Sequence, residues 1–162
     1  MDPAAVQGVA RLVGDNVERV IVGKRHEVLL VLVALLCRGH VLIEDVPGVG
    51  KTTLVRMMAS VTDRSLLEIN AVTAKVAELR DLVEEAKQLK AMAAGLTAIA
   101  FVDELYHFNR SQQNILLPSV ERGDIILVGT TTENPWIEIN KTLLSRMVIF
   151  ELHPLEEPDL VQ

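Results

Sequence analysis

A run of small and charged residues at positions 45–53 has the composition of a phosphate-binding loop. It matches the pattern G-x-x-x-x-G-K-[ST] at every position except the first, which is Asp45. Two glycines would let the backbone wrap around phosphates, Lys51 would place a positive charge near them, and the Thr52 hydroxyl could ligate magnesium. The backbone N–H groups of the loop and of the following helix would face the phosphates. The predicted contacts are Pro47, Gly48, Val49, Gly50, Lys51, Thr52 and Thr53.

The alternative interpretation of this run is a glycine-rich turn that arises by chance. Asp45 leaves that alternative open, because a carboxylate beside phosphates would repel them. The sequence Gly-Lys-Thr between a predicted strand and a predicted helix favours the phosphate loop.

A second candidate site is the pair Asp103 and Glu104, which ends an apolar run about 50 positions after the loop. At that spacing, a buried strand ending in two acids indicates phosphoryl chemistry. Asp103 would hold magnesium, directly or through water, and Glu104 would polarise the water that attacks the γ-phosphate. The alternative is a solvated pair of acids at a strand end.

A third group of polar residues, Gly129–Pro135, follows another apolar run and contains three consecutive threonines. If this run lies beside the first strand, the hydroxyls at its end could reach the γ-phosphate or the attacking water. The alternative is the ordinary strand preference of threonine followed by an Asn-Pro turn. The residues alone do not decide between the two.

Composition bounds the classes of protein that remain. The 162 residues fit one domain over 1–162, and 49% of them are hydrophobic, as a parallel sheet covered on both faces requires. The longest apolar run, Val28–Cys37, is far below the roughly 20 residues of a membrane span, and we interpret it as a buried helix that contains a buried Cys37. The net charge of −6 argues against direct nucleic-acid binding. A single cysteine and no secretory signal indicate a cytoplasmic protein.

The elements that must position these residues alternate between strands and helices, the pattern of an open α/β sheet. We predict helices over residues 4–20, 24–37, 51–60, 74–93, 111–121 and 141–145. We predict strands over residues 40–44, 66–70, 97–102, 124–129 and 147–152. Trp136 is expected to pack where the chain turns after the fourth strand.

Taken together, these motifs resemble the AAA+ ATPases over the whole chain. Residues 20–60 resemble the MoxR branch, in which an aspartate also occurs at the first loop position. Residues 66–160 resemble the RarA/MgsA branch, clamp-loader relatives associated with stalled replication forks, through Phe101–Glu104, Thr131–Pro135 and Leu143–Arg146. Our hypothesis for this split is a chimera, a designed chain or a reconstructed ancestor.

The resemblance implies a three-layer α/β/α fold whose five-stranded parallel sheet has the order 5-1-4-3-2. It implies ATP or ADP with Mg²⁺ as ligands and a ring-type homo-oligomer. It also implies further roles. Val22 and Gly23 would line the adenine pocket, and Asn70 would restrain Glu104. Thr132, with Thr131 as the near alternative, would be the first sensor, and Arg146 would act in trans on a neighbour's nucleotide.

AAA+ proteins carry a helical lid after the fifth strand, and this sequence ends near where that lid would begin. We therefore expect nucleotide binding to survive better than hydrolysis. Three functions stay open: a slow ATPase core, a nucleotide-binding module with negligible turnover, and a fragment of a DNA-maintenance ATPase.

Overall fold

Five parallel strands form the centre of the computed structural model, which describes residues 25–45, 51–92 and 96–152. The strands are β1 (His40–Asp45), β2 (Leu66–Asn70), β3 (Ala98–Asp103), β4 (Ile125–Thr131) and β5 (Met147–Leu152). Their order across the sheet is β2-β3-β4-β1-β5, which confirms the predicted order. β1 therefore lies between β4 and β5, in register with both, with Val41 opposite Val128 and Val148.

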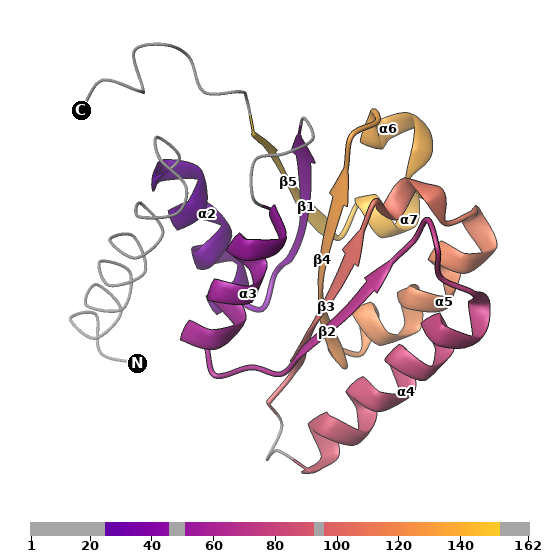
Figure 1. Cartoon of the computed structure of the whole chain (residues 1–162), viewed down its shortest axis with the longest axis horizontal. Helices are drawn as coiled ribbons and strands as arrows, with labels where there is room; N and C mark the ends of the chain where they lie inside the picture. The colour runs from indigo at the N-terminus through magenta and orange to yellow at the C-terminus, as the bar shows by residue number, and fades with distance from the viewer. Residues whose placement is uncertain (1–24, 46–50, 93–95, 153–162) are drawn as a thin grey trace.

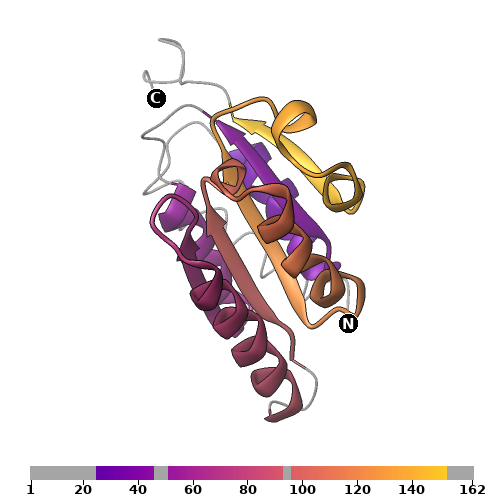
Figure 2. The same cartoon turned by 90° about the vertical axis from the view of Figure 1, so that its right-hand side faces the viewer.

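Helices connect the strands and cover both faces of the sheet (Figures 1 and 2). They are α2 (Arg25–Leu36), α3 (Lys51–Val61), α4 (Val76–Met92), the short 3₁₀ helix η1 (Leu105–His107), α5 (Arg110–Glu121), α6 (Pro135–Glu138) and α7 (Lys141–Leu144). α2 and α3 pack on one face, and α4, α5 and α7 pack on the other. The predicted three-layer α/β/α architecture is confirmed.

Each face of the sheet has its own apolar core, because alternate residues of a strand point to opposite sides. On β3, Ile99 and Phe101 pack with the residues of α2 and α3, whereas Ala100 and Val102 pack with those of α4 and α5. All seven residues of β4 are buried. A strand with both faces covered reads as a continuous apolar run, which is why these strands could be located from the sequence.

Two short elements after strand ends were not predicted. η1 follows Glu104 directly, and α6 begins at Pro135 with Asn134 as its N-cap, whose side chain accepts from the N–H of Trp136. The other described elements lie within two residues of their predicted limits. The helix predicted over residues 4–20 lies outside the described residues.

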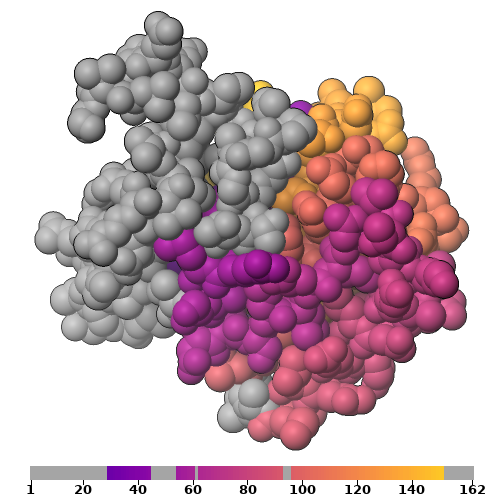
Figure 3. Space-filling model, viewed as in Figure 1, coloured from indigo at the N-terminus to yellow at the C-terminus, as the bar shows by residue number. Residues whose placement is uncertain are grey.

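The sequence-based expectations for Cys37 and Trp136 are wrong. Cys37 is exposed, because α2 buries only the stripe that contains Val31, Leu32 and Leu35, and the run Val28–Cys37 continues past it. Trp136 is 69% exposed, because α6 stands at the rim of the molecule, where it is seen in the space-filling view (Figure 3). Its neighbour Pro135 takes the buried position instead.

The apolar run in α2 does not make that helix a membrane span. Every helix in the described part of the chain is too short or too polar to cross a bilayer.

His40 is the first residue of β1, and its side chain accepts a hydrogen bond from the backbone of the neighbouring strand. Its Nδ1 accepts a hydrogen bond of 3.0 Å from the N–H of Leu127 in β4. Burial lowers the pKa of His40 below its ordinary value of 6.5, a backbone hydrogen bond with Val120 opposes that effect, and the charge of Arg146 adds to it. The folded protein therefore holds this imidazole neutral at a pH where the unfolded chain begins to protonate it.

We predict that the chain loses stability as the pH falls below about 6.5, because the unfolded state then binds more protons than the folded state. Replacing His40 by asparagine keeps an acceptor for Leu127, because Oδ1 takes the place of Nδ1, and it removes the titration. The free energy of unfolding in urea should fall less between about pH 7.5 and about pH 5.5 in His40→Asn than in the parent. The exposed His107, changed to asparagine, is the control. Equal losses in parent and His40→Asn would contradict the prediction.

Candidate active site

The carboxyl ends of the parallel strands meet at one edge of the sheet. β1 ends at Asp45, β2 at Asn70, β3 at Asp103 and β4 at Thr131. In open α/β sheets this edge is where ligands bind, and α3 begins at Lys51, with five residues between it and the end of β1. The predicted loop follows β1 and the acidic pair follows β3, so both belong to the same edge of the sheet, with β4 between the two strands.

Most of the predicted nucleotide contacts fall outside the described residues: Val22 and Gly23 of the adenine pocket, and Pro47, Gly48, Val49 and Gly50 of the phosphate loop. For Lys51, Thr52 and Thr53 the structure describes the backbone, which forms the first turn of α3. A helix of this length presents unpaired N–H groups and a positive dipole end at its start, which suits an anion. A strand ends at Asp45 and a helix begins at Lys51, as expected on the two sides of the predicted loop.

Asp103 receives hydrogen bonds on both carboxylate oxygens. The Thr130 hydroxyl donates to Oδ1 at 2.7 Å, and the amide nitrogen of Asn70 donates to Oδ2 at 3.3 Å. An ionised carboxylate offers about four lone-pair sites, so two donors orient the group and leave positions open. The open positions suit a magnesium ion or a water of its shell.

Glu104 has a left-handed backbone, with φ 56° and ψ 50°. This conformation is uncommon for a residue other than glycine, and it ends β3 and begins η1. Two features stabilise this backbone conformation. The side chain of the next residue, Leu105, is fully buried, and the Glu104 N–H donates to the Thr130 hydroxyl at 2.9 Å. Backbone strain of this kind concentrates at functional sites, which makes Glu104 a strong candidate.

Gly129 makes room for that turn. A Cβ atom at this position would lie 3.0 Å from Leu105 Cδ2 and 3.1 Å from Leu42 Cδ1. Both distances are shorter than ordinary side-chain contacts, so a larger residue would require the ends of the Leu105 and Leu42 side chains to shift. Gly129 thus allows the side chain that follows Glu104 to pack closely against β4.

Of the two threonines considered for the first sensor, Thr132 is the one beside the acidic pair. Its hydroxyl is 3.4 Å from Glu104 Oε2 and 3.3 Å from the hydroxyl of Tyr106. The Thr131 hydroxyl is used locally: it donates to the carbonyl of Glu133 at 2.9 Å and accepts from its N–H at 3.1 Å. The geometry favours Thr132.

Asn70 lies at the predicted edge but contacts a different acid from the one expected. Its amide nitrogen reaches Asp103, and its Oδ1 accepts from the N–H of Val72 at 2.9 Å. The reason is the register of the sheet, which places Asn70 directly opposite Asp103, whereas the left-handed backbone at Glu104 turns the chain out of the strand. Asn70 is thus a partner of the acid predicted to hold magnesium.

Thr130 was not singled out from the sequence, yet it makes the shortest contact in the site. The register pairs Val102 with Gly129, so the next residues, Asp103 and Thr130, become neighbours. The alternation of side chains along a strand could have placed Thr130 and Thr132 on the same face. To place Thr130 beside Asp103 also requires the register between β3 and β4, which is known only from the folded sheet.

Arg146 lies at the opposite edge of the sheet. It directly precedes Met147, which pairs with His40 where β1 begins. Its guanidinium donates to Glu121 Oε1 at 2.7 Å and to the carbonyl of Thr142 at 2.6 Å. In its own chain it therefore points at α5 and α7 and away from the acidic pair.

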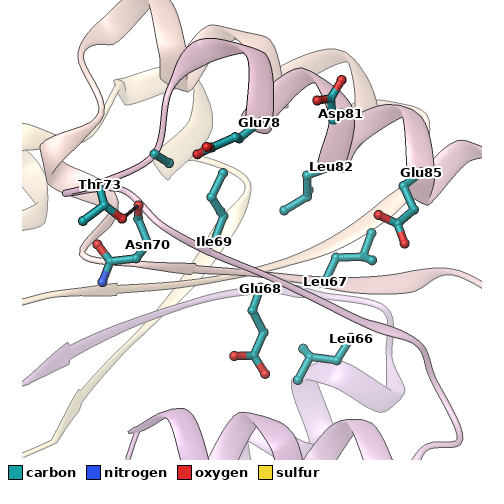
Figure 4. Close-up of a pocket in the computed structure, with 11 residues that line it drawn as sticks. Leu66, Leu67, Glu68, Ile69, Asn70, Thr73, Glu78, Asp81, Leu82 and Glu85 are labelled. Carbon is teal, nitrogen blue, oxygen red and sulfur yellow. Dashed lines mark hydrogen bonds between the residues drawn. The ribbon is translucent and has the colours of Figure 1, made fainter.

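A groove runs along the outer edge of β2 beside the site. It has a volume of about 480 Å³, and Figure 4 shows Leu67 and Ile69 on its α4 side and Glu68 on the other. A smaller cavity of about 240 Å³ is lined by both Asn70 and Asp103. Asp103 is thus reachable from the β2 side of the sheet as well as from its end.

The described residues contain no group of three or more histidine, cysteine, aspartate or glutamate side chains placed to hold a metal. Magnesium is usually held by one or two carboxylates together with substrate phosphates and water. Asp103, with its two donors and its open lone pairs, fits that kind of site, and Thr52 would be the second protein ligand.

Comparisons with known proteins agree with this geometry. Residues 41–155 match the family model described as "ATPase family associated with various cellular activities (AAA)". Replication-associated recombination protein A of Coxiella burnetii is 46% identical over 115 residues, covering 71% of this chain and 25% of the relative. The protein of that name from Bacillus subtilis is 36% identical over 116 residues, covering 72% and 26%.

A eukaryotic relative is also similar. ATPase WRNIP1 of Dictyostelium discoideum is 39% identical over 114 residues, which cover 70% of this chain and 13% of the relative. The chain thus spans about a quarter or less of the length of these relatives.

The matched residues include β1 from Val41 onward, β2 through β5, the acidic pair and the threonines that surround it. The similarity to the recombination proteins confirms the predicted resemblance to the RarA/MgsA branch, while the MoxR-like character of residues 20–60 stays a prediction. The chain belongs to the ATPase family associated with various cellular activities, and within that family it resembles replication-associated recombination protein A.

Proposed function

We propose that this chain binds ATP with Mg²⁺ and hydrolyses it slowly. The observation that carries the proposal is the arrangement of Asp103 and Glu104 at the carboxyl edge of the sheet, with donors from Thr130, Asn70 and Thr132 around them. Membership of an ATPase family supports ATP as the nucleotide.

The chain's own residues have distinct tasks in this reaction. The loop residues Gly48 and Gly50 and the side chain of Lys51 bind the phosphates, and Val22 and Gly23 line the adenine pocket. Magnesium, held by Thr52 and Asp103, would neutralise charge that develops on the phosphate oxygens.

Glu104 accepts a hydrogen bond from a water molecule and so orients the water oxygen toward the γ-phosphorus. Thr132 lies beside Glu104. The new P–O bond forms as the bond to the bridging oxygen of ADP breaks. The water protons end on the products, ADP and phosphate. Asn70 acts on this pair through Asp103.

Arg146 acts in a neighbouring copy of the chain in this proposal. It lies at the edge of the sheet opposite its own acidic pair, so a head-to-tail contact between copies would bring it to another copy's nucleotide. The guanidinium would then leave Glu121. Turnover is therefore expected to rise on assembly into a ring-type homo-oligomer.

A second candidate function is that of a fragment of a DNA-maintenance ATPase, supported by the names of the relatives. Those names speak against the expectation, drawn from the net charge of −6, that direct nucleic-acid binding is absent. The remaining alternative is a nucleotide-binding module with negligible turnover. The proposed setting in each case is the cytoplasm, which the single cysteine, Cys37, supports.

Two substitutions separate an ATPase from a binding module. Lys51→Ala should weaken binding of a fluorescent ATP analogue by about tenfold or more, because a charge-assisted contact to phosphate is lost. Glu104→Gln should keep that affinity and lower phosphate release by about 100-fold or more. Lys87→Ala and Glu84→Gln, an ion pair on the outer face of α4, are matched controls. Parent and Glu104→Gln with equal phosphate release would leave only the binding module.

Mixing two inactive variants tests the role of Arg146 in trans. Arg146→Ala retains an intact nucleotide site, and Glu104→Gln retains an intact arginine. In a random equimolar mixture about a quarter of head-to-tail interfaces would combine the two intact halves, so phosphate release should reappear. Light scattering with ATP checks that copies assemble. A mixture as inactive as its components, in an assembled sample, would remove the proposed role of Arg146.

Forked DNA tests the second candidate function. A fragment of a DNA-maintenance ATPase should raise the fluorescence anisotropy of a labelled fork at physiological salt, and the affinity should fall as salt increases. The same fork without protein, and with Lys51→Ala, provides the reference signals. An unchanged anisotropy with folded, nucleotide-bound protein would leave nucleotide hydrolysis as the function of this chain.

A further inference from the structure

Thr130 is the buried group that connects the two acids of the site. Its side chain is completely buried, its hydroxyl donates to Asp103 Oδ1 at 2.7 Å, and the same oxygen accepts from the Glu104 N–H at 2.9 Å. A hydroxyl has one proton to donate, and here that proton goes to Asp103. Water cannot take over either bond, because the side chain has no exposed surface.

We propose that Thr130 is a positioning residue that fixes the carboxylate of Asp103 and the backbone of Glu104 relative to each other. This inference rests on the proposed function of the acidic pair. In the proposed reaction Thr130 contacts neither the nucleotide nor the attacking water, and it acts through the two acids.

The bond to Asp103 sets where the free lone pairs of that carboxylate point. Oδ1 is the oxygen with the short donor, while Asn70 approaches Oδ2 at the longer distance of 3.3 Å. Without the hydroxyl the carboxylate would keep only the longer contact. Groups that orient a metal ligand from behind tune its affinity for the metal, so Thr130 should matter most when magnesium is present.

The bond to Glu104 acts on the backbone. Glu104 is one of three described residues other than glycine with positive φ, and its N–H has the Thr130 hydroxyl as its acceptor. The branched side chain of threonine restricts χ1, so the hydroxyl stays between the two groups. Serine could make both bonds but would hold them less firmly, and valine has the same shape with neither bond.

Thr131 is a matched control next in the chain. It is equally buried and its hydroxyl also makes two bonds, but both go to the backbone of Glu133. Thr131→Val therefore removes a buried hydroxyl with two partners and leaves the acids untouched. A role confined to stability would give Thr130→Val and Thr131→Val the same consequences.

The first measurement is the effect of magnesium on the affinity for a fluorescent ADP. In Thr130→Val the gain in affinity on adding Mg²⁺ should shrink by about tenfold, with the Mg²⁺-free affinity unchanged. Thr130→Ser should restore most of the gain, and Thr131→Val should match the parent. An equal gain in Thr130→Val and Thr131→Val would overturn the proposal.

The second measurement needs no nucleotide and no activity. Hydrogen exchange followed by NMR should show the Glu104 amide exchanging about tenfold faster, or more, in Thr130→Val than in Thr131→Val, because its acceptor is gone. An unchanged rate would also overturn the proposal. If the parent releases no phosphate, the proposed hydrolysis fails while both measurements still decide the role of Thr130.

Discussion

Parallel pairing of all five strands is the constraint on which the rest of this structure depends. Parallel neighbours cannot be joined by tight hairpins, so each connection crosses a face of the sheet, most often as a helix. The crossovers bury both faces, and they bring every strand's carboxyl end to one edge and the carboxyl ends of the connecting helices to the other. Arg38, Lys90 and Arg122, which lie at the ends of α2, α4 and α5, suit the negative ends of those helix dipoles.

The same constraint explains how much the sequence could predict. The inner strands β3 and β4 are buried almost throughout, so they read as apolar runs, and the acids Asp103 and Glu104 could be recognised at the end of β3. The edge strands β2 and β5 are partly exposed but are still mostly apolar, so they were located as well. The register of β3 with its two neighbours, β2 and β4, could not be predicted from the sequence. That register makes Thr130 the neighbour of Asp103 and directs Asn70 to Asp103 instead of Glu104. The prediction that Cys37 is buried was wrong, because its burial depends on which stripe of α2 faces the sheet.

The two edges of the sheet divide the chemistry of the chain. The carboxyl edge holds acids with donors fixed around them, which suits a metal and a water. The amino edge holds cations, among them Arg146, which pairs with Glu121. His40 lies at the same edge, and burial lowers its pKa. The head-to-tail contact proposed above would bring the amino-edge arginine of one copy to the acidic edge of the next.

The left-handed backbone of Glu104 has a consequence for how this chain would respond to engineering. Glycine, and to a lesser degree asparagine, adopts φ near +56° at lower cost than glutamate does. A library selected for heat resistance alone would therefore be drawn towards those residues at position 104 and would discard the carboxylate. A left-handed backbone and the acid proposed to polarise the attacking water belong to the same residue, so gains in stability at position 104 would come at the expense of the proposed chemistry.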